Sequence, residues 1–155
     1  MHITPLVTPT SVAGISVGDD IESLTSSLTE ASLPFLESRF ENCGITFRKV
    51  DVSRHGITAV AGPNGRIVRV SCALPYAGRY RESYFPGMTI GELRSVAKKL
   101  LLIHGMIVAD DEFRVAFEFP ETFDGVGYDD VDYVNELPTH MPVSGIHIQD
   151  AEWWR

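Results

Sequence analysis

Alternation of apolar and polar residues marks the clearest element of the chain. In residues 113–119, FRVAFEF, an apolar side chain occupies every second position. This period predicts a β-strand with one buried face. Weaker alternation predicts further strands at residues 45–52, 56–61, 66–72, 131–136 and 145–149. The pair Asn64-Gly65 lies between two of these strands and predicts a β-hairpin.

Helical spacing of apolar residues appears twice. Leu24 and Leu28 continue a stripe that begins after Ser16, and a second stripe runs from Ile90 to Leu101. Each spacing predicts an amphipathic helix. A third, weaker helix is predicted over residues 33–42, where Pro34 suits the first turn.

The same six-residue pattern precedes both main helices: GISVGD at Gly14–Asp19 and GMTIGE at Gly87–Glu92. A hydroxyl followed three residues later by an acid is a capping-box arrangement. The recurrence makes a degenerate tandem repeat one interpretation of the chain. The order helix, strands, helix, strands predicts an α+β fold, with an antiparallel sheet and amphipathic helices packed on one face.

Length and composition agree with an ordinary globular domain. A chain of 155 residues is expected to form a single domain, 1–155. Two cysteines, Cys43 and Cys72, are too few for a disulfide framework and are expected to be small buried residues. The N-terminus shows no signal-peptide pattern and the apolar runs are too short to span a bilayer, so we expect a cytoplasmic protein with no membrane partner.

Charge is divided unevenly along the chain. Residues 110–155 carry 12 acidic and 2 basic side chains, a net of −10, whereas residues 1–109 have a net of +2. Aromatic residues are interleaved with these acids. Such a surface suits a basic protein partner and would repel nucleic acid, which we exclude as a partner. The competing interpretation is that the phenylalanines are core residues and the acids only a solvated face.

Chemical motifs do not point to catalysis. The sequence lacks GxxxxGK[ST], GxGxxG, HExxH and paired CxxC motifs, and the acids near Asp124 fail the EF-hand spacing. We therefore expect no enzyme, no cofactor and no metal. An active site of scattered residues is an alternative that sequence alone does not test.

The glycine-bounded motifs, the size and the acidity resemble those of small bacterial immunity proteins, which protect a cell from a polymorphic toxin, as in contact-dependent growth inhibition. This resemblance implies a cytoplasmic, noncatalytic inhibitor that binds a cognate toxin domain, which is basic and in many such systems a nuclease. The alternative is a non-enzymatic adaptor or homo-oligomeric assembly subunit that uses an exposed edge strand. From charge and aromatic content, the candidate partner-binding residues are Asp110, Asp111, Glu112, Asp124, Tyr128, Asp129, Asp130, Asp132, Trp153 and Trp154.

Overall fold

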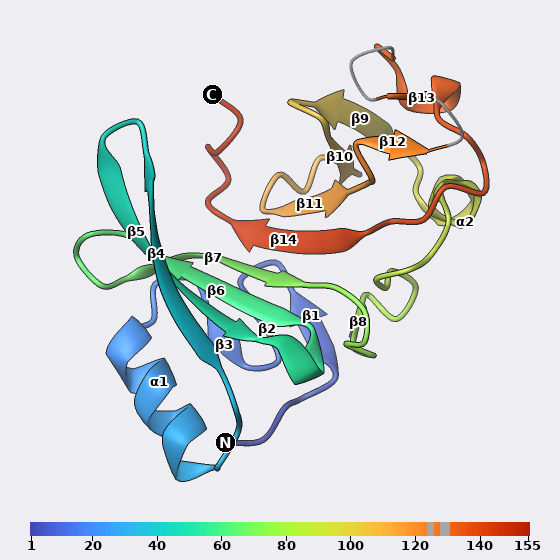
Figure 1. The fold of residues 1–155 in the computed structure, drawn as a ribbon. Helices are drawn as coiled ribbons and strands as arrows, with labels where there is room; N and C mark the ends of the chain where they lie inside the picture. The colour runs from blue at the N-terminus through green and yellow to red at the C-terminus, as the bar shows by residue number, and fades with distance from the viewer. Residues whose placement is uncertain (124–125, 128–130) are drawn as a thin grey trace.

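The computed structural model describes residues 1–123, 126–127 and 131–155. Within these residues, one antiparallel sheet of eight strands dominates, in the order β4-β5-β6-β7-β14-β11-β10-β9 (Figure 1). Its strands are β4 (Leu36–Asn42), β5 (Ile45–Val52), β6 (Ile57–Ala61), β7 (Ile67–Cys72), β9 (Leu100–Ile103), β10 (Met106–Ala109), β11 (Val115–Glu118) and β14 (Gly145–Gln149). The predicted antiparallel sheet is confirmed.

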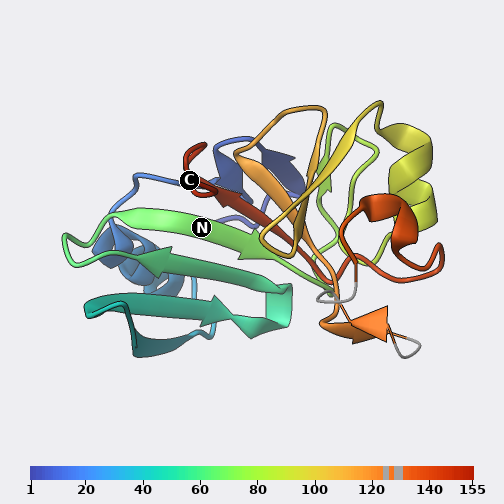
Figure 2. The same cartoon turned by 90° about the horizontal axis from the view of Figure 1, so that it is seen from above.

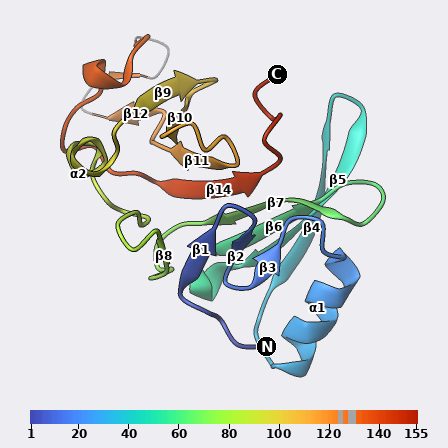
Figure 3. The same cartoon turned by 180° about the vertical axis from the view of Figure 1, so that it is seen from behind.

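A smaller, mixed sheet covers part of the large one. It joins β3 (Ile15–Ser16), β2 (Ser11–Val12), β1 (Leu6–Thr8) and β8 (Arg79–Tyr80), and its β1–β8 pair is parallel. Figures 1 and 3 show this sheet and the first helix on the same side of strands β4–β7. A short hairpin, β12 (Thr122–Phe123) and β13 (Val126–Gly127), lies apart from both sheets.

The core lies on the covered face of the large sheet. Alternate residues of the central strands, among them Val70, Phe117, Ile146 and Ile148, are fully buried there. Their neighbours along each strand face the opposite side of the sheet, because successive side chains in a strand point to opposite faces. That opposite face carries a groove lined by residues of β4–β7 and the side chains of Ser71, His147 and Glu118.

Two short α-helices lie at opposite ends of the described molecule (Figure 2): α1 (Ile21–Glu30) and α2 (Ile90–Val96). The predicted capping box of α2 is confirmed. Thr89 Oγ1 accepts from the amide of Glu92 at 3.1 Å, and Glu92 Oε1 accepts from the amide of Thr89 at 3.2 Å. Two single-turn 3₁₀ helices, η1 (Ser53–His55) and η3 (Val134–Glu136), complete the described elements. The described part of the chain is mostly β, with less helix than α+β implies.

Several helix boundaries differ from the sequence prediction. The first helix begins at Ile21, because Ser16 still belongs to β3. The second ends at Val96, and the leucines after it form strand β9. The amides of Lys98 and Lys99 donate to the side chain of Asp110, so the chain is held beside the end of β10 and cannot continue as helix.

Two further predicted elements were wrong. Residues 33–42 contain β4 instead of a helix, since Leu36–Asn42 pairs with β5 along its whole length. The described residues of 131–136 contain the 3₁₀ turn η3 and no strand. Cys72 is buried as expected, but Cys43 is exposed in the β4–β5 turn.

The two halves of the large sheet are arranged alike. Each helix is followed by four strands, and the last strands, β7 and β14, pair at the centre. Before α1, the amide of Gly18 donates to Ile67 O at 2.7 Å; before α2, the amide of Gly87 donates to Val143 O at 2.8 Å. Gly18 and Gly87 therefore make equivalent backbone hydrogen bonds, whereas the motif comparison aligns Gly87 with Gly14.

Candidate functional site

The loop after β10 contains three of the predicted binding acids. Asp110 Oδ1 accepts the amides of Lys98 and Lys99 at 2.9 and 2.8 Å. Asp111 forms an ion pair with Lys99 Nζ at 2.9 Å. The first of these acids shapes the loop, and the second has a cation beside it.

The third acid of this loop is also paired. Glu112 Oε1 accepts from Arg114 Nε at 2.8 Å, and Oε2 accepts from the same guanidinium at 3.0 Å. This contact lowers the pKa of Glu112. The loop thus presents less uncompensated negative charge than the sequence count suggests.

Both predicted tryptophans lie against this loop. Trp153 Nε1 donates to the carbonyl of Phe113 at 2.5 Å, and the ring of Trp154 packs on the ring of Phe113 at 5.4 Å. The carbonyl of Trp154 lies 2.8 Å from His104 Nε2 in the β9–β10 turn. The structure therefore brings Asp110–Glu112 and Trp153–Trp154 together.

The remaining predicted residues are placed differently. Asp132 lines a pocket between α2, β9 and η3, together with Arg94 and Lys98. Four residues of the predicted set lie outside the described residues: Asp124, Tyr128, Asp129 and Asp130.

A groove that the sequence did not reveal lies on the face of the large sheet opposite the core. It has a volume of about 330 Å³ and runs beneath the β4–β5 hairpin. Its apolar lining comes from separate elements: Phe40, Phe47, Val60, Val68 and Trp153. The Phe40 and Phe47 rings stack with centroids 5.4 Å apart, as expected for residues directly opposite in β4 and β5.

A β-bulge shapes the floor of this groove. Ala61 pairs with Ile67 and Val60 pairs with Arg69, so Val68 has no cross-strand partner in β6. A bulge redirects side chains that would otherwise alternate. Val68 and Arg69, although adjacent in sequence, both line the groove.

Arg69 is the notable polar residue of the groove. It is half-buried, and its Nε is fully buried without a hydrogen-bond partner among the described residues. Burial lowers the pKa of its guanidinium, and the nearby charge of Glu118 opposes this effect. Glu118 does not neutralise Arg69 by direct contact, because its carboxylate binds His147.

Three side chains beside the groove form a chain of hydrogen bonds across β7, β14 and β11. Ser71 Oγ lies 2.5 Å from His147 Nδ1, and His147 Nε2 lies 2.9 Å from Glu118 Oε2. Because a carboxylate can only accept, Nε2 carries a proton, and in neutral imidazole Nδ1 then accepts from the serine hydroxyl. The hydrogen bond from His147 lowers the pKa of Glu118.

This order of groups matches nucleophile, base and orienting acid in hydrolases. A hydrolase also needs donors aimed at the developing oxyanion, usually backbone N–H groups. At Ser71 and His147, strands β7 and β14 pair with a neighbouring strand on both sides, so the backbone there belongs to the sheet ladder. The three residues form a polar network that links the central strands β7, β14 and β11.

Neither a metal cluster nor a membrane-spanning helix is found in the described part of the chain. Among the described residues, no three His, Cys, Asp or Glu side chains are close enough to hold a metal ion. None of the described helices is long and apolar enough to cross a membrane.

Comparison with known proteins shows a shared fold. The sequence matches no known family and no curated protein. The fold resembles that of the uncharacterized protein yfeY from Escherichia coli. The two share 14% sequence identity with a TM-score of 0.69, over 94% of this chain and 99% of yfeY. At this identity the likeness to yfeY shows the fold alone, so function is argued from the residues.

Proposed function

We propose that the protein is a noncatalytic assembly subunit in which two copies join through their β4 strands. The supporting observation is the exposure of β4, which lies at the edge of the large sheet with all seven residues exposed. Leu36 is 71% exposed. An edge strand presents unpaired N–H and C=O groups, and an uncovered one readily pairs with another chain.

The sequence of β4 is complementary to itself. In an antiparallel pair centred on Ser38, Leu36 would face the second copy's Phe40, and Glu37 would face its Arg39. Two-fold symmetry repeats both contacts. Apolar and opposite-charge pairs directly across a sheet are favourable, by about 0.2–1 kcal/mol each. Arg39 has no ion pair with any described residue of its own chain.

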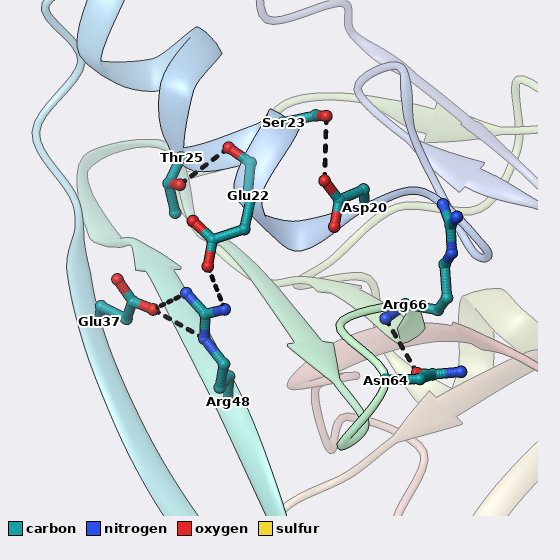
Figure 4. A network of polar contacts seen from close by, with 8 residues as sticks. All are labelled: Asp20, Glu22, Ser23, Thr25, Glu37, Arg48, Asn64 and Arg66. Atoms are coloured by element: carbon teal, nitrogen blue, oxygen red, sulfur yellow. Dashed lines mark hydrogen bonds and ion pairs between the residues drawn. The ribbon is translucent and has the colours of Figure 1, made fainter.

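The side chain of Glu37 is held in place by Arg48, at a position where it could make such a contact. Arg48 binds both Glu37 and Glu22, which fixes the Glu37 carboxylate beside β5 (Figure 4). Both contacts from Arg48 to Glu37 use Oε1. Oε2 therefore remains available to a partner's arginine.

Sedimentation of charge-reversal variants tests the proposal. Wild type should be dimeric, and Glu37→Arg and Arg39→Glu should each be monomeric, since each places like charges opposite one another twice. An equimolar mixture of the two variants should recover dimers, because the pairs are then again opposite in sign. Glu41→Arg is the matched control: in this register it faces Phe35 and should dimerise as wild type does. A monomeric wild type, or single variants that dimerise normally, would refute the proposal.

A second candidate is the immunity-type inhibitor, which binds and neutralises a basic toxin domain such as a nuclease. It is favoured by the convergence of Asp110–Glu112 with Trp153–Trp154, acids beside large aromatic rings. Titration of a basic nuclease domain at low and high salt tests it. Binding that weakens with salt and is lost in Trp154→Ala would support it; no binding at either salt would exclude that domain as the partner.

We also propose that the fold is a degenerate tandem repeat. Beyond the matching hydrogen bonds before the two helices, both first hairpins turn through two left-handed residues, Cys43-Gly44 and His104-Gly105. The long segment between β11 and β14 would be an insertion in the second half. Superposing residues 18–72 of this fold on residues 87–149, and the same halves of yfeY, should align the four strands in order.

A further inference from the structure

We infer that the groove beneath the β4–β5 hairpin binds a small molecule with a single carboxylate on an apolar body, and that Arg69 binds the carboxylate. The volume of about 330 Å³ falls at the lower end of small-molecule sites. Phe40 lines the groove and also belongs to the β4 edge, but binding of a carboxylate by Arg69 does not require pairing at that edge.

The apolar part of the groove would hold the body of the ligand. Phe40 and Val68 are 38% and 41% exposed, although they lie beside the largely buried Val60. Exposed apolar side chains gathered in one concave place are unfavourable in water and are typical of ligand sites. The ring of Trp153 belongs to the same lining, so an occupant would contact an intrinsic fluorophore.

The charged end of the ligand follows from Arg69. A guanidinium with a buried, unpartnered Nε carries a desolvation cost that an oxygen ligand removes. Its planar N–H groups match a carboxylate in bidentate geometry. Gln149 lies opposite Arg69 in the strand register and also lines the groove, so its amide is placed to add a donor.

The remaining groups restrict the ligand to one negative charge. Asp150 lies at the groove, and its Oδ1 accepts the amide of Glu152 at 2.7 Å. Glu118 contributes a second nearby negative charge. A dianion would meet repulsion from both carboxylates, whereas a monocarboxylate needs only Arg69.

Octanoate and octanol form a matched pair of probes that differ at the polar end. Octanoate should bind wild type saturably, quenching or shifting tryptophan emission and moving the Arg69 Nε–H resonance. Octanol should bind at least roughly tenfold more weakly, as expected when a charge-assisted hydrogen bond is lost. Equal binding of the two probes, no saturation, or an unmoved Arg69 resonance would overturn the inference.

Three variants test whether Arg69 is the group that binds the carboxylate. Arg69→Gln should weaken octanoate binding roughly tenfold or more. Arg66→Gln, an exposed arginine of the same hairpin that does not line the groove, should bind as wild type does. Arg39→Glu should also keep full octanoate binding, whether or not β4 mediates dimers. Unchanged binding in a folded Arg69→Gln protein would refute the assignment.

Discussion

Gly56 offers a sharp test of how the sheet is assembled. It lies between η1 and β6 with φ +68°, and its carbonyl accepts from the amide of Ala73 at 2.8 Å. A Cβ at this position would lie 2.0 Å from Ala73 O and 3.0 Å from the amide nitrogen of Tyr76. Both neighbours are backbone atoms, so Gly56→Ala would have to push the chain after β7 away.

The expected cost has three parts. A left-handed conformation costs an L-residue roughly 1–2 kcal/mol. Loss of the Gly56–Ala73 hydrogen bond adds about 1 kcal/mol, and the displaced contacts after β7 add about 1 kcal/mol or more. Together, Gly56→Ala should lower the free energy of unfolding by roughly 3–4 kcal/mol, a large part of the 5–15 kcal/mol of a typical domain.

Gly44→Ala is the matched control, because Gly44 also has a positive φ, +76°, but an added Cβ would have no atom within 4 Å. It should cost only the conformational part, roughly 1–2 kcal/mol. Urea unfolding followed by circular dichroism measures both variants. Equal losses in the two, or a loss below about 1 kcal/mol for Gly56→Ala, would refute the close approach on which the reasoning depends.

Three further predictions follow from the same contacts. Thr89→Ala removes the capping box of α2 and should cost about 1 kcal/mol in urea unfolding. Because His147 lowers the pKa of Glu118, the stability from that carboxylate is present above its ordinary pKa of 4.5 and is lost as the pH falls through the lowered value. The stability difference between wild type and Glu118→Gln should therefore shrink from pH 7 to pH 3. Burial raises the pKa of Cys72 to about 12, so a thiol reagent at pH 8 should label the exposed Cys43 alone until the protein is unfolded.

Most strands of the large sheet were predictable from the alternation of apolar and polar residues. β5, β6, β7, β11 and β14 fall inside the predicted segments, and the Asn64-Gly65 hairpin joins β6 to β7. These segments carry β-branched and aromatic residues on the buried face, and no competing period fits them.

Residues 33–42 were misread for a physical reason. Leu36 and Phe40 are four residues apart, a spacing that places two side chains on one face of either a helix or a strand. Pairing with β5 decides in favour of the strand. The leucines after Val96 were ambiguous in the same way, and the contact of Lys98 and Lys99 with Asp110 ends the helix.

Prediction of the candidate sites from the sequence was limited for a different reason. Charge along the sequence pointed to Asp110–Glu112 and to the tryptophans, which do converge, but it did not show that Lys99 and Arg114 pair with two of these acids. The groove could not be predicted from the sequence, because Phe40, Arg69 and Trp153 are distant in sequence and meet only through strand order and a bulge. The Ser71–His147–Glu118 network likewise depends on the β7–β14–β11 register.

The central pairing of β7 with β14 has a consequence for how the sheet assembles. A polypeptide containing only one half would leave its last strand unpaired on one side. Two such chains would have to associate before either could complete the central pairing. Their assembly would then depend on concentration. A single chain that contains both halves removes that dependence, because the second set of strands is always tethered to the first.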